Sequence, residues 1–101
     1  MALLGDGAVL AHPFVVGEIA LGQLRSREVA LRELQRLPSA ATASYEEVLH
    51  LIEQRRLFGT GLSYIDIHLL ASTRLTEGAL LWTLDDGLHL AAMQMKLAYY
   101  A

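Results

Sequence analysis

The sequence predicts an α/β fold in which helices cover both faces of a short parallel sheet. Two continuous apolar runs, residues 8–11 and 79–83, have the composition of strands that are buried on both faces. Helical patterns lie between these runs, and strands that alternate with helices are joined by crossovers into a parallel sheet. The composition is 53% hydrophobic and 19% charged over 101 residues, which predicts one compact domain spanning residues 1–101.

The first part of the chain is predicted to contain one strand and two helices. Residues 1–7 have the pattern of a helix end that runs into a turn. Residues 8–11 follow as a strand, and Pro13 then opens a helix, because its missing N–H costs nothing in a first helical turn. Ser26 is a suitable N-cap for a second helix over residues 27–37.

Two helices in the middle of the chain are predicted to begin with capping boxes. Ser44 is followed three residues later by Glu47, and Ser63 by Asp66. In this pattern the side chain of the first residue accepts a hydrogen bond from the backbone N–H of the second, and the side chain of the second accepts one from the backbone N–H of the first. A short strand is predicted before the first of these helices, over residues 40–43.

The last part of the chain contains the clearest predicted strand, residues 79–83. A helix over about residues 87–97 is predicted to follow it, with an edge strand over residues 98–100. Because ligands bind at the carboxyl ends of parallel strands, the residues that directly follow a strand are candidates for a functional site.

Charge and composition exclude several classes of protein. The net charge of -3 and the pI near 5.7 exclude a strongly basic nucleic-acid binder, but not a nuclease with a local basic rim. The absence of cysteine excludes disulfides and zinc–thiolate sites. No stretch approaches the ~20 apolar residues of a membrane span, and the first residues lack the basic region of a signal peptide. We therefore expect a cytoplasmic protein.

Acidic residues in apolar surroundings are the candidate functional residues. Glu18 lies within a predicted helix between valines and an isoleucine, Asp66 lies near a helix start, and Asp85 and Asp86 follow the clearest strand. Carboxylates that converge within ~4 Å repel by roughly 4 kcal/mol per pair at an effective dielectric near 20, so protons or cations must compensate them. Oxygen ligands favour Mg²⁺ or Mn²⁺, which can activate a water for phosphodiester hydrolysis.

Each acid also has a structural interpretation. Asp66 at the third helical position can simply be a capping residue, and the spacing alone does not distinguish a cap from a metal ligand. One of Asp85 and Asp86 is expected to cap the last helix. Glu18 has no such local explanation, so it is either partnered or faces a cleft.

The histidines and large aromatic residues are expected to be structural. We predict that His12 and His68 are core or supporting residues and not metal ligands. Trp82 and Phe14 are predicted to belong to the core and not to form a platform for stacking bases.

Taken together, four segments resemble the PIN-domain family, and specifically the VapC-type toxin ribonucleases of bacterial toxin–antitoxin pairs. They occur in the family's order: His12-Pro-Phe-Val-Val-Gly-Glu-Ile-Ala-Leu-Gly22, Arg56-Leu-Phe-Gly59, Tyr64-Ile-Asp-Ile-His-Leu-Leu-Ala-Ser72 and Leu81-Trp-Thr-Leu-Asp85. The resemblance implies a parallel sheet between helices in three layers, and Mg²⁺- or Mn²⁺-dependent cleavage of RNA, often transfer or ribosomal RNA. It also implies a cognate antitoxin as partner and a homodimer.

Residue by residue, the resemblance implies a catalytic metal site. Glu18, Asp66 and Asp85 match three of the family's acidic metal-binding positions, and Thr83 matches the hydroxyl residue beside the last acid. Asp86 stands where the family often has a basic or other residue and is not assigned to the metal.

The departure from the family pattern lies at the beginning of the chain. The family's first strand ends in Asp-Thr or Asp-Ser and lies at the centre of the sheet, and nothing before Ala8 matches it. We therefore expect an N-terminally truncated PIN-like domain whose sheet has an unfilled centre between residues 8–11 and 79–83, and whose metal site lacks one acid. A misplaced start codon or a gene fragment is the simplest explanation.

Two alternatives to an active nuclease follow from this departure. In the first, the chain is an inactive remnant that binds an antitoxin helix or pairs with itself through apolar residues around Phe14, Leu21 and Leu57. In the second, it is a small helical interaction module without a metal, which requires the acids to lie far apart in space.

Overall fold

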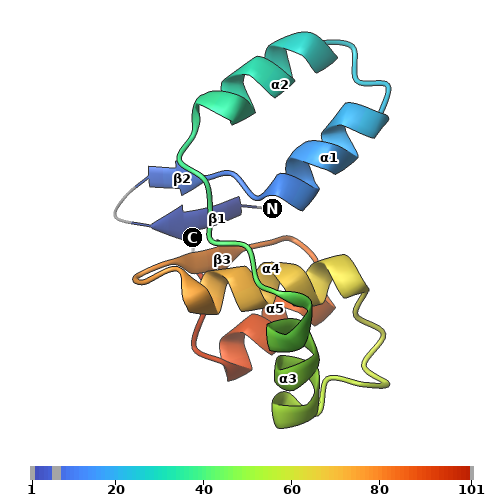
Figure 1. Ribbon diagram of the computed structural model, residues 1–101, viewed down its shortest axis with the longest axis vertical. Helices are drawn as coiled ribbons and strands as arrows, with labels where there is room; N and C mark the ends of the chain where they lie inside the picture. The colour runs from blue at the N-terminus through green and yellow to red at the C-terminus, as the bar shows by residue number, and fades with distance from the viewer. Residues whose placement is uncertain (1, 6–7, 101) are drawn as a thin grey trace.

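The computed structural model describes residues 2–5 and 8–100, and within these it contains a three-stranded sheet and five helices (Figure 1). The strands are β1 (Ala2–Gly5), β2 (Ala8–Leu10) and β3 (Leu80–Trp82). The helices are α1 (Pro13–Leu21), α2 (Arg27–Arg36), α3 (Tyr45–Arg55), α4 (Tyr64–Leu75) and α5 (Asp86–Gln94).

The sheet is antiparallel, so the predicted parallel sheet is wrong. Its order is β2-β1-β3, and β1 pairs antiparallel with both neighbours, with Leu3 opposite Leu10 on one side and Leu81 on the other. Two residues separate β1 from β2 in the sequence. This length permits a hairpin, whereas a parallel connection needs a crossover of a dozen or more residues.

Strand β1 also corrects the two expectations for the beginning of the chain. Residues 2–5 form a strand and not a helix end, while the turn predicted at residues 5–7 lies mostly outside the described residues. The centre of the sheet between β2 and β3, which was expected to be unfilled, is occupied by β1. Leu3 is only 1% exposed, so this strand contributes to the hydrophobic core as well as to the hydrogen-bonded ladder.

The two other predicted strands, residues 40–43 and 98–100, each reduce to an isolated bridge nearby. Ser39 bridges Ala11, and Ala98 bridges Leu81, both in the parallel sense. Residues 40–43 do not continue as a strand because the chain turns toward α4, where the N–H of Ala41 donates to Oγ1 of Thr76 at 3.1 Å.

The helix starts follow the predicted capping residues closely. Both capping boxes are present: the side chain of Glu47 accepts from the N–H of Ser44 at 2.8 Å, and that of Asp66 from the N–H of Ser63 at 3.0 Å. Pro13 occupies the first turn of α1 as expected. Ser26 precedes α2 as the N-cap residue, but its side chain makes no capping hydrogen bond.

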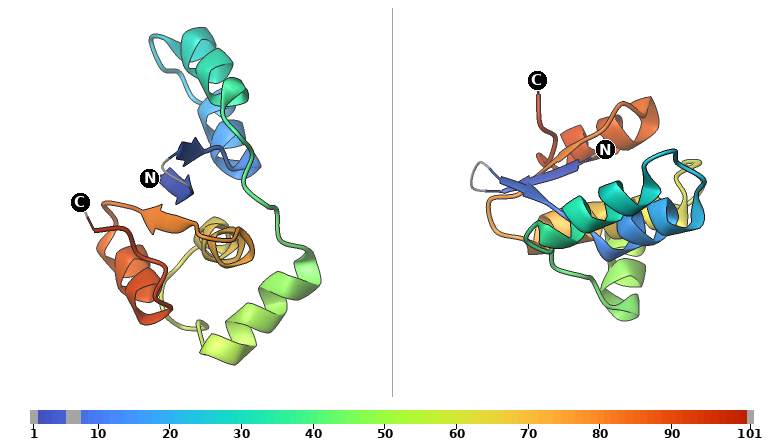
Figure 2. Two further views of the ribbon diagram at one scale, coloured as in Figure 1. Left: turned by 90° about the vertical axis from the view of Figure 1, so that its left-hand side faces the viewer. Right: turned by 90° about the horizontal axis from the view of Figure 1, so that it is seen from above.

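Most of the core lies around β3 and α4. Figure 2 shows β3 with α4 on one side and α5 on the other, and α3 packs against α4. The largest fully buried apolar side chains come from these elements and from β1. They are Leu3, Val48, Leu69, Leu70, Leu81 and Leu88.

Helices α1 and α2 form a hairpin that extends away from this core (Figures 1 and 2). They pack against each other, and over their full lengths neither contains a buried residue. Several apolar side chains on or beside the hairpin are exposed, among them Leu21, Leu24 and Val29. This arrangement leaves apolar surface available to another molecule.

None of the helices in residues 2–5 and 8–100 has the length and hydropathy that crossing a bilayer requires.

Candidate functional site

Asp66 is held in place by the start of α4. Its Oδ2 accepts a hydrogen bond from the N–H of Ser63 at 3.0 Å, and its own N–H donates to Oγ of Ser63 at 3.1 Å. The capping interpretation of Asp66 is therefore correct. Only one of its carboxylate oxygens is used by this bond, and the residue is half-buried, so the cap does not by itself exclude a second role.

Asp85 is the N-cap of α5 and is oriented by Thr83. Its Oδ2 accepts from the N–H of Leu88 at 2.8 Å, and its N–H donates to Oγ1 of Thr83 at 3.1 Å. Thr83 is buried at the end of β3, whereas Asp85 and Asp86 are exposed. The expected cap of the last helix is thus Asp85, and Asp86 occupies the first position of the helix.

Glu18 lies at the edge of an apolar groove between the hairpin and α4. The groove has a volume of about 620 Å³ and is lined by Val15, Ile19 and Leu24 from the hairpin side and by Ile65 and Leu69 of α4. Glu18 is exposed at its rim. Of the two sequence-based possibilities for this residue, the cleft is present, and among residues 2–5 and 8–100 Glu18 has no ion-pair partner.

The three acids do not assemble into a metal site in the described structure. Among residues 2–5 and 8–100, no three side chains of His, Asp or Glu come together closely enough to hold an ion. As arranged here, the residues present therefore do not fit the Mg²⁺ or Mn²⁺ that the resemblance implies. The roles of Glu18, Asp66, Asp85 and Thr83 remain predictions.

His12 and His68 are buried between the hairpin and α4, which confirms their predicted structural placement. Nδ1 of His12 accepts from the N–H of Phe14 at 3.0 Å, so Nε2 carries the proton and donates to Oγ of Ser72, 2.8 Å away. Burial lowers the pKa of His12, and the neighbouring His68 lowers it further. Burial likewise lowers the pKa of His68.

Phe14 was predicted to be a core residue, and this holds only in part. Phe14 is half-buried and makes edge contacts to His12 and His68, with ring centroids 5.1 and 4.5 Å apart. Nδ1 of His68 is buried without a hydrogen-bond partner in the described part of the chain. An unpaired buried nitrogen is compatible with a neutral imidazole packed among rings.

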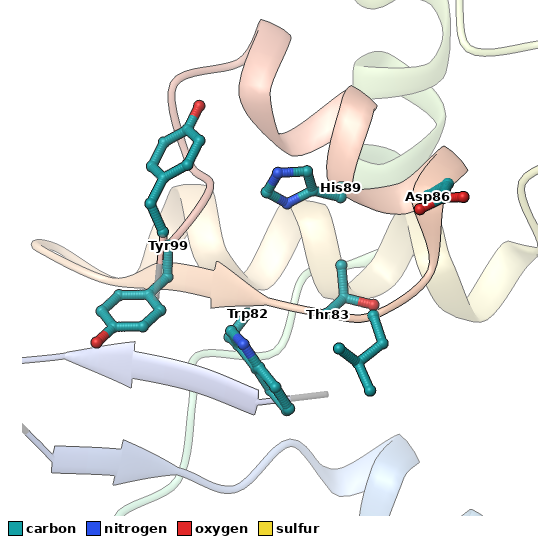
Figure 3. A pocket seen from close by; sticks show the side chains of 7 residues that line it. Trp82, Thr83, Asp86, His89 and Tyr99 are labelled. Atoms are coloured by element: carbon teal, nitrogen blue, oxygen red, sulfur yellow. The ribbon is translucent and has the colours of Figure 1, made fainter.

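Trp82 is half-buried and lines an open pocket of about 300 Å³ (Figure 3). The other lining residues are Thr83, Leu84, Asp86, His89, Tyr99 and Tyr100. We call this the aromatic pocket. The sequence alone does not reveal this pocket, because its residues come from β3, α5 and the following segment, which the Leu81–Ala98 bridge brings together. The pair of tyrosines at the end of the chain was the available signal.

Comparison with known proteins identifies two curated relatives. Both are Ribonuclease VapC32 of Mycobacterium tuberculosis, from strain CDC 1551 / Oshkosh and strain ATCC 25618 / H37Rv. Each is 42% identical to this chain over 96 residues, which are 95% of this chain and 77% of the relative. No family model matches the sequence, and no solved structure matches it.

Proposed function

Because this chain belongs to the VapC family of ribonucleases, we propose that it is the toxin of a toxin–antitoxin pair and hydrolyses phosphodiester bonds of RNA. The observation that carries the proposal is the 42% identity over 95% of the chain to Ribonuclease VapC32. The partners are then an RNA, of the transfer or ribosomal class, and a cognate antitoxin.

We assign the activity to Glu18, Asp66 and Asp85. Glu18 is exposed at the groove, and the capping bonds of Asp66 and Asp85 each occupy one carboxylate oxygen. Thr83 supports Asp85 by accepting its backbone N–H. The family resemblance names Mg²⁺ or Mn²⁺ as cofactor, but the acids do not group around an ion here, so the proposal includes no metal-dependent step.

The test is cleavage of a transfer-RNA pool by the full chain, with Mn²⁺ and with EDTA. We expect cleavage by the parent chain and loss of cleavage in Glu18→Gln, which keeps the shape of the side chain and removes its charge. Glu53→Gln is the matched control, because Glu53 is also an exposed helical glutamate, on α3 and outside the groove. Cleavage that survives in Glu18→Gln would remove Glu18 from the site, and a folded parent chain without activity would refute the proposed function.

A second candidate function is supported by the hairpin. Helices α1 and α2 have no buried residue, and the groove beside them is mostly apolar, as expected of a surface that another protein covers. In this second function, we propose that the chain cleaves no RNA and acts only by binding an antitoxin helix or a second copy of itself. A folded chain that forms a dimer or a stable antitoxin complex, but cleaves no RNA under any metal condition, would favour this function.

A further inference from the structure

The α1–α2 hairpin is joined to the rest of the molecule at its base and through His12. At the base, the N–H of Ala11 donates to the carbonyl oxygen of Pro38, and the N–H of Ala40 donates to that of Ala11, each at 2.8 Å. Beyond this base, α1 and α2 contain no buried residue and extend away from the core (Figures 1 and 2). A segment with few buried contacts opens at a lower free-energy cost than a core does.

His12 connects the hairpin to α4 through both nitrogens of its ring. Nδ1 accepts from the N–H of Phe14 at 3.0 Å and so caps α1, while Nε2–H donates to Oγ of Ser72 on α4 at 2.8 Å. The neighbouring ring of Phe14 makes an edge contact to His68 of α4, with ring centroids 4.5 Å apart. The neutral ring makes both hydrogen bonds, but the positively charged ring cannot, because it is a donor at each nitrogen.

The surroundings of His12 do not suit a positive charge. A cavity of about 50 Å³ beside the ring is lined, apart from His12, by apolar residues of β1, β2, α1 and α2 and by Ala11. On α4 the titratable neighbour is His68, whose charge would repel one on His12. The charged residue of α1 is Glu18, which is exposed at the groove and does not line this cavity. Within residues 2–5 and 8–100, the hydrogen bonds of His12 include none to a carboxylate.

We propose that His12 is a pH-sensitive switch: when its ring takes up a proton, α1 loses its cap and the hairpin separates from α4, while the base of the hairpin stays paired. The added proton lies on Nδ1, where it faces the N–H of Phe14. Two donors then oppose each other, and a charge lies in a site that is 1% exposed and has no acid. Because burial lowers the pKa of His12 in the closed form, the proton is taken up when the hairpin opens.

Release of the hairpin would divide the apolar groove between its two walls. One wall belongs to the hairpin and carries Glu18 at its rim, and the other consists of Ile65 and Leu69 of α4. Separation therefore moves Glu18 away from the helix that carries Asp66 and exposes the apolar side chains of both walls. The inference goes beyond the proposed function and does not depend on it, since the hairpin opens in the same way whether the chain cleaves RNA or only binds a partner.

Amide hydrogen exchange of the full chain, followed residue by residue by NMR at about pH 7.5 and about pH 5.5, tests the proposal. We expect amides of α1 and α2 to be less protected than those of α4 at both pH values, because the hairpin opens without the core. After correction for the intrinsic pH dependence of exchange, protection of the hairpin should fall at the lower pH. The part of this fall that belongs to His12 should be about tenfold, because an ordinary histidine with a pKa of 6.5 binds the proton roughly ten to one at that pH.

Three variants assign the effect to His12. His12→Asn can still cap α1 but does not titrate, so the fall in hairpin protection should be about tenfold smaller than in the parent, and the remainder belongs to His68. His12→Gln does not titrate either, and its side-chain amide can donate to Ser72 in place of Nε2–H, so it should show the same smaller fall. His50→Gln is the matched control, because His50 is an exposed histidine on α3, and it should leave the fall unchanged.

Three results would overturn the proposal. Protection of the hairpin equal to that of α4 at both pH values would mean that the hairpin opens only when the whole chain unfolds. Protection of the hairpin that is the same at both pH values would remove the switch. A fall in His12→Asn and His12→Gln as large as in the parent would assign the effect to a group other than His12.

Discussion

Replacing Ser72 with alanine removes one buried oxygen atom from the contact between α4 and the start of the α1–α2 hairpin. Ser72 is 0% exposed, and its Oγ is the hydrogen-bond partner of Nε2 of His12 at 2.8 Å. Alanine is the best helix former and fits the space that serine leaves, so α4 itself is not weakened. The perturbation therefore isolates one hydrogen bond that joins segments sixty residues apart in the sequence.

The expected cost follows from what is left without a partner. His12 is 1% exposed, and in the variant its Nε2–H has lost its acceptor in a buried environment. An unsatisfied buried donor costs about 1–3 kcal/mol, and the better helix propensity of alanine offsets roughly 0.5 kcal/mol of this. We expect Ser72→Ala to lower the free energy of unfolding by about 0.5–2.5 kcal/mol.

Urea unfolding followed by circular dichroism measures this change. With an m value of about 1.5 kcal/mol/M, a loss of about 1.5 kcal/mol lowers the unfolding midpoint by about 1 M. His12→Asn provides the second arm of a double-mutant cycle, since asparagine can still cap α1 but is too short to reach Ser72. A coupling energy of about 1 kcal/mol is expected between the two positions. Equal effects of Ser72→Ala in the parent and in His12→Asn would refute the reasoning.

Three further predictions concern stability. Burial, and then the neighbouring His68, lower the pKa of His12 in the folded chain from its ordinary value of 6.5. The unfolded chain therefore binds the proton more readily, and the free energy of unfolding should fall as the pH drops below 6.5. Urea midpoints measured above and below that pH check this prediction, and midpoints that do not change with pH would contradict it. Gly17→Ala, at a helical position with open space around it, should stabilise the chain by about 0.5–1 kcal/mol, whereas Gly61→Ala, at a φ of 83°, should destabilise it by about 1–2 kcal/mol in the same urea assay. Ser63→Ala should cost about 1 kcal/mol through the lost cap of α4, and an unchanged midpoint would exclude that role.

Features that depend on neighbouring residues were predictable from the sequence. The two capping boxes and the helix start at Pro13 involve residues that are at most three positions apart, and the structure confirms them. The sheet was not predictable in the same way. Leu3 lies opposite Leu81 in the sheet and its side chain belongs to the core, and neither the short apolar segment around Leu3 nor its composition indicates such a distant partner.

The candidate site shows the same division. The capping roles of Asp66 and Asp85 follow from local spacing, and the structure contains both. The surroundings of Trp82 depend instead on the bridge between Leu81 and Ala98, which places Tyr99 beside β3. Hydrophobic periodicity describes one helix or strand at a time. It therefore could not reveal a pocket whose residues come from β3, α5 and the segment that follows α5.

The two neighbours of β1 differ greatly in how far away they lie along the chain. Leu3 meets Leu10 within one hairpin, but its other partner, Leu81, lies far along the sequence. Local contacts form early, because closing a short loop costs less entropy than closing a long one, and an isolated hairpin is only marginally stable. During translation we therefore expect β1 to present an open edge until Leu80–Trp82 has left the ribosome. In that interval the edge is available to other nascent chains, so the pairing of β3 with β1 is what protects β1 from aggregation.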